Sequence, residues 1–371
     1  MALTDLDDLP IHQIPYTMDH VEGRDPRWVD ELWFHIGSRD GASVAVHMGV
    51  YPGTNTMDGA ASIMSGGAQT DLRFARVLEG DRDRRVVGPL RAEIVEPFRA
   101  WRLVLEPSGD RPASFDITFR ATNEPMEVSA PVFHRRDGRH VVWDLWQYAQ
   151  AGSATGTLTI EDKTFDLSPA WGAARERSWG VRPIFGQVPK FAPVPDSICS
   201  RSLWIAGDFG ERSLWLWRME PLEGGRPHLT GNLADETGRT RLDGAIAFGL
   251  DAGTPQLRIV AAEPSLTYSG DGRTLAPSSI TLTDWDGGQH TLAIRPLRTL
   301  HSIGLGYGHP DFRHIEYKGT VAQVVKTAVN AANHAALLAN PAGHVNVFGV
   351  EQLCELTLDG VTGLGVARLS I

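Results

Sequence analysis

The sequence predicts an all-β protein with two β-barrel domains side by side and one helix in the C-terminal domain. Short apolar or alternating segments, each bounded by turn residues, recur along all 371 residues. The 39 glycines and 23 prolines are spread through the chain and divide it into segments of strand length. Pairs such as Asp137-Gly138 and Gly287-Gly288 supply the positive φ angles that tight hairpin turns require.

The expected strands follow one another along both halves of the chain, and only one stretch is typical of a helix. That stretch, residues 320–338, is rich in Ala and Leu and ends before Asn340-Pro341. The segments expected to be strands are residues 31–36, 43–51, 99–106, 114–121, 140–149, 156–160, 213–219, 245–250, 256–262, 279–285, 290–297 and 350–358.

A proline-rich stretch predicts the boundary between the two domains. Residues 183–196 contain four prolines in fourteen residues and little periodic pattern, as expected of an extended linker. We therefore expect an N-terminal barrel over residues 1–185, a linker over 186–197 and a C-terminal barrel over 198–371. Each half has the strand content of one small barrel.

Composition excludes several classes of protein. The chain is 42% hydrophobic and 22% charged, which is ordinary for a globular protein with a core. A net charge of −10 argues against binding to nucleic-acid phosphates, which requires clustered Lys and Arg. Cys199 and Cys354 make no disulfide framework, the N-terminus shows no secretory leader, and no apolar run reaches the length of a membrane span. We expect a cytoplasmic protein.

The motifs of the common cofactor-dependent enzymes are missing. No Gly-x-Gly-x-x-Gly follows a strand and opens a helix, and there is no P-loop, no His-Glu-x-x-His and no Gly-x-Ser-x-Gly. His309 and His314 lie close in the sequence, but their spacing fits no common zinc site. We therefore expect neither an organic cofactor nor a metal.

The most distinctive local feature is the stretch Arg-Glu-Arg-Ser-Trp-Gly at residues 175–180. In an extended conformation, Glu176 and Ser178 face one side, and the two arginines and Trp179 face the other. One hypothesis is a buried arginine–glutamate cluster that holds the two domains together. The other is catalysis by Glu176, which needs an apolar pocket to raise its pKa, although the neighbouring arginines act to lower it.

Tryptophans gather on both sides of the predicted boundary. Trp204, Trp215 and Trp217 follow it, and Trp143 precedes the motif that contains Trp179. Core packing is the expected role of any single one of them. As a group they also suit the wall of a cavity for a flat or polyene-like ligand, or the cation–π stabilisation of a carbocation. These five tryptophans are the candidate substrate-binding residues.

A glycine-rich segment, residues 304–314, supplies an acid–base set. Its glycines allow tight turns, and Tyr307, His309 and Asp311 carry groups that can donate or accept protons. The alternative is an irregular loop whose His and Asp cap backbone groups. Asp208 is a further candidate acid, for which a turn aspartate is the alternative.

Together, the Arg-Glu-Arg-Ser-Trp-Gly stretch, the tryptophan-rich strands after it and the Gly-Tyr-Gly-His segment at 306–309 resemble the carotenoid 1,2-hydratase (hydroxyneurosporene synthase) group of the AttH-like superfamily. The resemblance implies two lipocalin-like β-barrels side by side, a fold that some fungal pericyclases share. It also implies a pocket for isoprenoid-like or polycyclic compounds, and hydration, dehydration, isomerisation or cyclisation without an organic cofactor. The nearest match to the Trp- and Asp-rich stretch of the hydratases is Trp204-Ile-Ala-Gly-Asp208-Phe.

Three functions are compatible with these features. The first is a cofactor-independent lyase or isomerase acting on a terpenoid-, steroid- or polycyclic-like molecule, with Glu176, Asp208 or Asp311 as the acid and with Tyr307 and His309 as a proton relay. The second is a non-catalytic, lipocalin-like carrier of an apolar metabolite. The third is a structural protein with filled barrels. The expected partner is a hydrophobic small molecule, and a homodimer is a candidate assembly.

Overall fold

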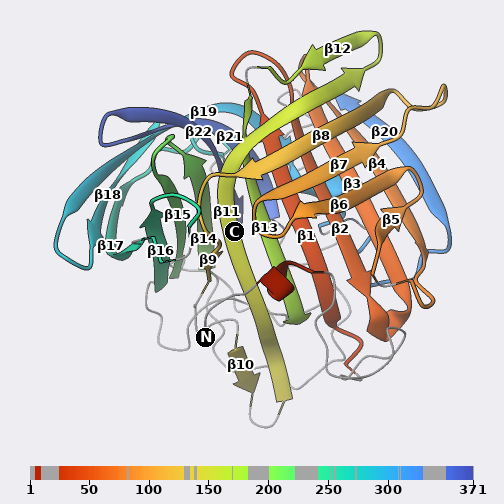
Figure 1. Ribbon diagram of the computed structural model, residues 1–371, viewed down its shortest axis with the longest axis horizontal. Coiled ribbons are helices and arrows are strands. Elements are labelled where there is room, and N and C mark those ends of the chain that lie inside the picture. Colours follow the sequence, from red (N-terminus) through yellow and green to blue (C-terminus); the bar gives the residue numbers. More distant parts are fainter. Residues whose placement is uncertain are drawn as a thin grey trace.

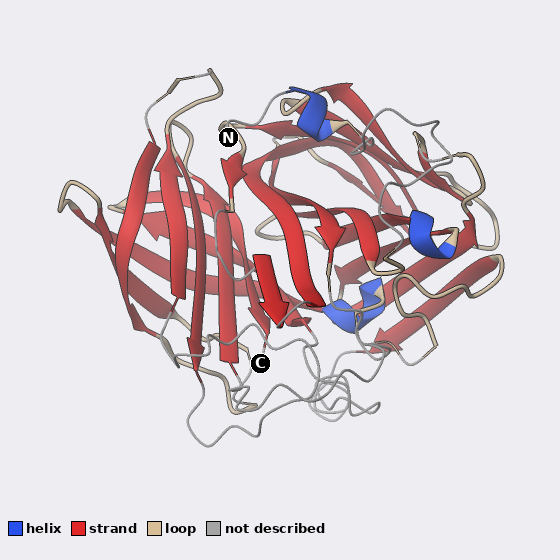
Figure 2. Ribbon diagram, turned by 90° about the horizontal axis from the view of Figure 1, so that it is seen from below, coloured by secondary structure: helices blue, strands red, loops and turns tan. Residues whose placement is uncertain are grey.

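The chain folds into two β bodies that lie side by side, a curled sheet and a closed barrel (Figure 1). A view turned by a right angle shows the same two bodies in contact (Figure 2). The computed structural model describes residues 5–9, 25–81, 83–128, 134–137, 140–168, 170–182, 200–221, 241–251, 253–254, 256–271, 274–307, 309, 311–328 and 348–370.

Within these residues, fourteen strands make up the curled sheet. They are β1 (Trp28–Gly37), β2 (Ser43–Tyr51), β3 (Thr56–Ser65), β4 (Ala68–Val77), β5 (Arg85–Val87), β6 (Leu90–Glu96), β7 (Ala100–Leu105), β8 (Ala113–Ala121), β9 (Met126–Glu127), β10 (His134–Asp137), β11 (His140–Ile160), β12 (Lys163–Asp166), β13 (Trp171–Val181) and β20 (Val321–Ala328). The main path runs β20-β4-β3-β2-β1-β13-β11-β8-β7-β6-β5, and β9, β10 and β12 pair with β11.

The closed barrel takes eight of the described strands, in sequence order around the barrel. They are β14 (Ser200–Asp208), β15 (Ser213–Pro221), β16 (Arg241–Ala247), β17 (Gln256–Ser265), β18 (Ser278–Asp284), β19 (Gln289–His301), β21 (Phe348–Leu358) and β22 (Val361–Ser370). Short 3₁₀ turns are η1 (Asp5–Asp8), η2 (Pro52–Thr54) and η4 (Ser302–Leu305). The prediction of an all-β protein with two barrel-like halves is confirmed.

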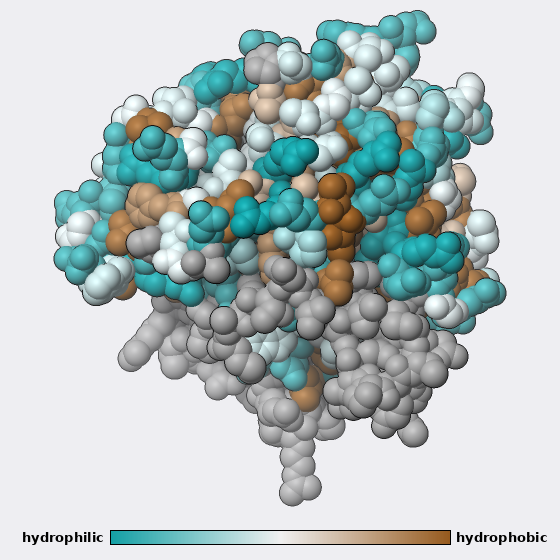
Figure 3. Space-filling model, in the orientation of Figure 1, coloured by the Kyte–Doolittle hydropathy of each residue, from teal (hydrophilic) through white to brown (hydrophobic). Residues whose placement is uncertain are grey.

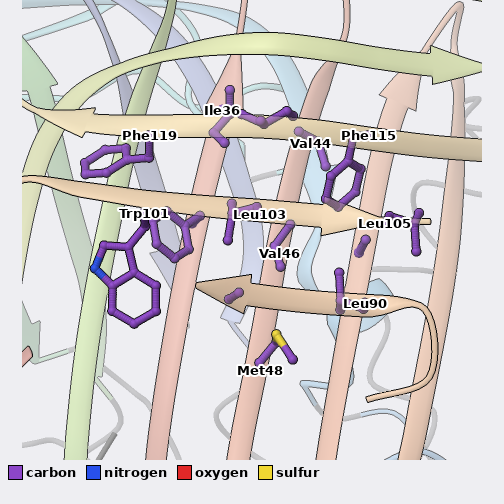
Figure 4. Packing of buried hydrophobic residues seen from close by; sticks show 14 of the residues in the cluster. Ile36, Val44, Val46, Met48, Leu90, Trp101, Leu103, Leu105, Phe115 and Phe119 are labelled. Carbon is purple, nitrogen blue, oxygen red and sulfur yellow. The ribbon is translucent and has the colours of Figure 1, made fainter. Parts of the chain in front are cut away.

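The curled sheet folds over its own apolar face. Along β1, Leu32, Phe34 and Ile36 join the core inside the curl, whereas the residues between them face the other way, because successive side chains of a strand alternate. Figure 4 shows that other strands of the same sheet cross over this face, and that Trp101 lies on one of them. The interior of the curl is therefore filled by packed side chains, including Val46 of β2.

The closed barrel is filled in the same way. Leu203 and Ile205 of β14 belong to the aliphatic cluster inside it. The alternate positions, Trp204 of β14 with Trp215 and Trp217 of β15, belong to a separate cluster shared with the curled sheet. These three tryptophans therefore lie between the two bodies and not within a barrel.

The predicted helix over residues 320–338 is wrong where the structure describes it. Val321–Ala328 form strand β20, which pairs with β4 at the edge of the curled sheet. Figure 1 shows this blue strand from late in the chain beside the red and orange strands of the first half. The β-branched Val and Thr side chains of this segment favour a strand. Residues 329–338 lie outside the described residues.

The predicted linker also lies outside the described residues, so the domain boundary stays a prediction. The pairing of β20 with β4 shows that the second half of the chain completes the first sheet.

Hydrophilic residues cover most of the described part of the face in Figure 3, and apolar residues form separate patches there. No helix in the described part of the chain is long and apolar enough to cross a membrane.

Close packing between the two bodies depends on a glycine of β13. A Cβ atom at Gly172 would lie 2.3 Å from Leu364 Cβ of β22. We expect Gly172→Ala to lower the free energy of unfolding by about 1–3 kcal/mol, because neither backbone can give way without disturbing its sheet. Urea unfolding measures this effect.

The matched control is Gly109→Ala, in an exposed turn where a Cβ would meet no atom within 4 Å. It should change the free energy of unfolding by less than about 0.5 kcal/mol. Equal effects of the two substitutions would contradict the packing of β13 on β22.

Candidate functional site

The two bodies meet at a buried junction that contains several ionisable side chains. The outer face of β1, β2 and β3 forms one wall of it, and the outer face of β14 and β15 forms the other. A bridging segment, defined as the described residues 302–307, 309 and 311–318, lies between β19 and β20 and contributes Leu305, Tyr307 and Ile315 to the junction. The apolar members of the junction include Trp33, Trp204, Trp215, Trp217, Leu300, Leu305, Tyr307 and Ile315.

Polar contacts with β4 hold the start of the bridging segment in place. Arg73 Nε donates to the Gly304 carbonyl at 2.8 Å, and Gln69 Nε2 donates to the His301 carbonyl at 3.0 Å. A Cβ at Gly304 would lie 2.1 Å from Asp71 Oδ1. Any other residue here would displace the ends of the Asp71, Ser62 and Gln69 side chains, which occupy this space.

Asp58 of β3 anchors the end of the bridging segment through contacts with His314 and Lys318. It is fully buried, and its carboxylate accepts from His314 Nδ1 at 3.1 Å and from Lys318 Nζ at 2.9 Å. Tyr51 of β2 donates its hydroxyl to the same carboxylate at 3.1 Å. One acid on the first half of the chain thus gathers two residues from the second half.

A second buried carboxylate, Glu31 of β1, lies on the other side of Tyr51. The Tyr51 hydroxyl is 3.1 Å from Glu31 Oε1, and Arg182 at the end of β13 forms an ion pair with Glu31 Oε2. His47 Nε2 lies 3.7 Å from Glu31 Oε1, beyond hydrogen-bonding distance. The two carboxylates therefore face two cations, Arg182 and Lys318, and the cluster balances its charge.

This arrangement keeps both acids ionised. Burial alone would raise the pKa of Glu31, but the charge of Arg182 and the neighbouring His47 ring hold that pKa down at about 2. Burial acts in the same way on Asp58, and Lys318 and His314 outweigh it, so its pKa lies well below the ordinary value. Neither carboxyl group can donate a proton near neutral pH.

His314 is a neutral imidazole at neutral pH. Burial, with His47 beside it, lowers its pKa to about 4, although Asp58 opposes the shift. Because Nδ1 faces a carboxylate that can only accept, Nδ1 carries the proton and Nε2 carries the lone pair. Within the described residues, Nε2 of His314 and both ring nitrogens of His47 have no hydrogen-bond partner.

The three rings at this point pack closely together. The centroids of His47 and His314 are 4.1 Å apart, and Tyr307 lies 4.9 Å from His314 and 5.4 Å from His47. Burial and the Glu31 carboxylate raise the pKa of Tyr307, so its hydroxyl stays protonated. A proton acceptor and a proton donor thus lie side by side.

The backbone next to His314 is shaped around the ring. Gly306 has a φ of +108°, and a Cβ there would lie 2.8 Å from His314 Cε1 and 3.0 Å from His314 Nε2, too close for the ring to keep its place. Ile315 has a φ of +74°, which is unusual for a β-branched residue. Strained backbone of this kind is retained where the surroundings hold it, often at functional sites.

His47, Asp58 and His314 could also hold a metal ion, because each offers one ligand atom within 4.8 Å of the others. The charge balance argues against it. Lys318 already neutralises Asp58, and a divalent cation would add two uncompensated charges to a buried cluster. The arrangement suits proton transfer better than metal binding.

The Arg-Glu-Arg motif lies along β13 as its alternation predicted. Glu176 faces the junction and forms an ion pair with Arg368 of β22, while Arg175 and Arg177 face away from it. The Arg368 guanidinium lies 4.8 Å from the rings of both Trp33 and Trp204. This contact joins the two bodies through Arg368, and the arginines of the motif itself pair with Asp8 and Asp30 on the opposite face.

A second polar contact joins the bodies beside it. Glu351 of β21 accepts from Trp33 Nε1 and from His35 Nδ1, each at 3.0 Å. Both donors lie on the outer face of β1, next to the buried carboxylates. The junction is therefore fixed by hydrogen bonds as well as by apolar contact.

Of the predicted catalytic residues, the structure brings Glu176 and Tyr307 to the junction. His309 is half-buried, its Nδ1 accepts from the Asp311 backbone N–H at 3.1 Å, and the Asp311 side chain is exposed. Asp208 lies at the end of β14, where its carboxylate accepts from the Gly210 N–H at 3.2 Å. Burial raises the pKa of Asp208.

Of the predicted substrate-binding residues, Trp204, Trp215 and Trp217 line the junction. Trp217 Nε1 donates to Ser202 Oγ at 2.9 Å, which fixes its ring. Trp179 packs instead with Phe98 and Tyr148 on the far side of β13. Trp143 lies in β11 opposite Arg135, and its side chain is outside the described part.

Sequence reasoning missed Glu31, His47, Asp58 and His314. They come from three strands and a distant segment, and no local motif connects them. One signal was available: β1, β2 and β3 are otherwise apolar strands, yet each carries at least one Asp, Glu or His. A strand buried on both faces that still contains such residues indicates a buried polar cluster.

The chain can be assigned to a family by a match over nearly its whole length. The profile of a family of unknown function, DUF8625, matches residues 3–369. The chain belongs to DUF8625. No curated protein matches this DUF8625 chain.

Two solved structures of CghA are similar to the DUF8625 chain in fold. CghA alone gives a TM-score of 0.50 at 12% identity, covering 98% of this chain and 95% of that chain. CghA with Sch210972 gives a TM-score of 0.48 with the same identity and coverage. At this identity the likeness shows the fold alone. Neither comparison names a carotenoid hydratase, so that resemblance stays a prediction.

The neutral state of His314 makes stability depend on pH. Its pKa is about 4 in the folded chain and about 6.5 when unfolded, so the unfolded chain binds one more proton between these values. Stability should therefore fall by on the order of 3 kcal/mol as pH drops from 6.5 to 4. Urea unfolding across this range measures the slope.

His314→Gln should flatten that slope, most clearly above pH 4.5, where Glu31 and Asp58 stay ionised in the folded chain. Burial and Arg73 lower the pKa of His309 to about 4. His309 therefore contributes to the slope in the same direction in the wild type and in His314→Gln. The control is His290→Gln, because Asp359 and Asp284 raise the pKa of His290 despite its burial. An unchanged slope in His314→Gln would contradict the buried neutral imidazole.

Proposed function

We propose that this protein is an enzyme that transfers protons on a hydrophobic small molecule bound at the junction, without an organic cofactor. The observation that carries the proposal is the His314 ring. Its Nδ1 is held by Asp58, and its Nε2 carries an unshared lone pair beside the Tyr307 ring. A carboxylate that orients an imidazole in this way prepares it to act as a base.

Each group of the cluster has a distinct role. His314 Nε2 accepts a proton from carbon, and Asp58 stabilises the imidazolium that forms. Tyr307 supplies a hydroxyl that donates to an oxygen of the substrate or returns a proton. His47, stacked on His314, is placed to relay the proton within the cluster.

The protonation states favour one reaction class among those expected from the sequence. Direct hydration of an alkene needs a strong acid, but Glu31 and Asp58 are held ionised and Glu176 is paired with Arg368. A base and a weak acid suit isomerisation or elimination. In isomerisation a C–H bond breaks, its proton moves to Nε2, the double bond shifts, and a proton is returned at another carbon without oxidation or reduction.

The surroundings suit an apolar substrate. Trp33, Trp204 and Trp217 supply the aromatic wall, with Ala and Leu side chains between them. Terpenoid-, steroid- and polycyclic-like molecules fit such a wall through their flat apolar faces. A carrier would use the same wall, but the oriented imidazole gives it no advantage, and this observation favours the enzyme.

The test follows the proton, so it works with a substrate that has not been identified. Organic extract of the source cells is incubated in D₂O with the wild-type protein, with His314→Gln or with His290→Gln, and is analysed by liquid chromatography and mass spectrometry. We expect the wild type to convert or deuterate a component of the extract. His314→Gln should do so at least about 100-fold more slowly.

His290 lies on the barrel surface and pairs with Asp284 and Asp359, so His290→Gln should retain wild-type activity. Equal rates in His314→Gln and the wild type would refute the role of His314. A compound that binds the wild type and is recovered unchanged, without deuterium, would establish the carrier instead.

A further inference from the structure

On the opposite face of β13 from the junction, the buried Arg175 lies at the centre of a second polar site. Its guanidinium is 1% exposed and lies 5.2 Å from the ring of Tyr148, 5.5 Å from that of Trp101 and 5.7 Å from that of Phe119. The junction chemistry uses none of these groups. An arginine enclosed by aromatic rings is a strong anion receptor, because little water competes for its charge.

The carboxylate of Asp8, from the 3₁₀ turn η1 near the N-terminus, occupies this site. Asp8 Oδ2 accepts from the Phe98 backbone N–H at 2.6 Å and from Trp101 Nε1 at 3.0 Å. Asp8 Oδ1 accepts from Arg175 Nη1 at 3.0 Å and from the Tyr148 hydroxyl. Each carboxylate oxygen therefore receives two donors, a full set for a bound carboxylate.

All four donors belong to the curled sheet and its turns, and none belongs to the segment that carries Asp8. Arg175 is held independently of Asp8, because Gln150 Oε1 accepts from Arg175 Nε at 2.9 Å. Gln150 is itself fixed by its Nε2, which donates to the carbonyls of Phe98 at 2.8 Å and Asn123 at 2.7 Å. The sheet thus builds the receptor, and the N-terminal segment supplies the anion and one further contact, the Leu9 carbonyl that accepts from Arg177 Nη2 at 3.0 Å.

The site continues into an apolar cluster. Phe98, Tyr148 and Trp179 pack together next to the carboxylate, and Trp146 packs against them. Phe98 and Trp179 are the most exposed of the buried hydrophobic residues in the described part of the chain, at 9% and 8%. A ligand with an apolar body behind its carboxylate would find aromatic contact at this point.

We propose that Arg175, Tyr148, Trp101 and the Phe98 N–H form a binding site for a hydrophobic carboxylic acid, which Asp8 occupies as an internal ligand. Exchange of one carboxylate for another keeps the buried charge of Arg175 compensated. Withdrawal of Asp8 without replacement would leave that charge unpaired, which is strongly unfavourable.

The first test replaces the internal ligand. Asp8→Ala removes one carboxylate, which formate can replace. We expect sodium formate to raise the melting temperature of Asp8→Ala by about 2–4 °C more than equal sodium chloride, because a ligand that binds only the folded state stabilises it. Asp8→Asn, whose amide still fills the site, is the matched control and should show no difference between the two salts.

The second test addresses the apolar part. Octanoate should stabilise Asp8→Ala at a concentration at least about tenfold lower than formate, because its chain adds apolar contact. Octanol should not. Equal potency of octanoate and formate would refute the hydrophobic ligand class, and no response to either anion would refute the site.

The wild-type protein provides a test that does not depend on the stability of a variant. Octanoate should increase hydrogen exchange in residues 5–9, because Asp8 is displaced, and octanol should leave it unchanged. If hydrogen exchange in residues 5–9 stays unchanged at saturating octanoate, the proposed displacement of Asp8 by another carboxylate is refuted. None of these readouts involves catalysis, so they are independent of the function proposed for the junction.

Discussion

Two carboxylates buried on the outer face of the curled sheet determine how the rest of the molecule is assembled. Glu31 and Asp58 lie on β1 and β3, where an unpaired charge would be strongly destabilising. Their cations come from elsewhere: Arg182 from the end of β13 and Lys318 from the bridging segment. The compensation of Asp58 thus fixes the path of the chain between β19 and β20, and the bridging segment on that path contributes Tyr307 to the junction.

The same charge balance decides what chemistry the junction can perform. With both acids neutralised by fixed cations, His314 lies in a buried environment that disfavours its protonation, although Asp58 still orients its ring. The interiors of both bodies are packed with side chains, and the tryptophans of β14 and β15 belong instead to the apolar cluster of the junction. The function proposed for the junction uses this aromatic cluster together with the imidazole of His314.

Local patterns in the sequence predicted local structure well and long-range pairing poorly. The alternation of residues 175–180 placed Glu176 on one side of β13 and its arginines on the other, and the structure agrees. Composition suggested a helix at 321–328, yet the segment is an edge strand, because its partner β4 lies some 250 positions away and no local pattern reports such pairing. The Glu31–His47–Asp58–His314 cluster was missed for the same reason, although Tyr307, a candidate named from the sequence, lies beside it.

The most direct test of this account is the protonation of His314, measured by ¹⁵N NMR of the protein labelled at its histidine side chains between pH 5 and 8. The account predicts one imidazole, missing from the spectrum of His314→Gln, that keeps the shifts of a neutral ring with a protonated Nδ1 throughout. A signal for His314 that titrates with a midpoint near the ordinary value of about 6.5 would contradict a buried, charge-balanced base at the junction.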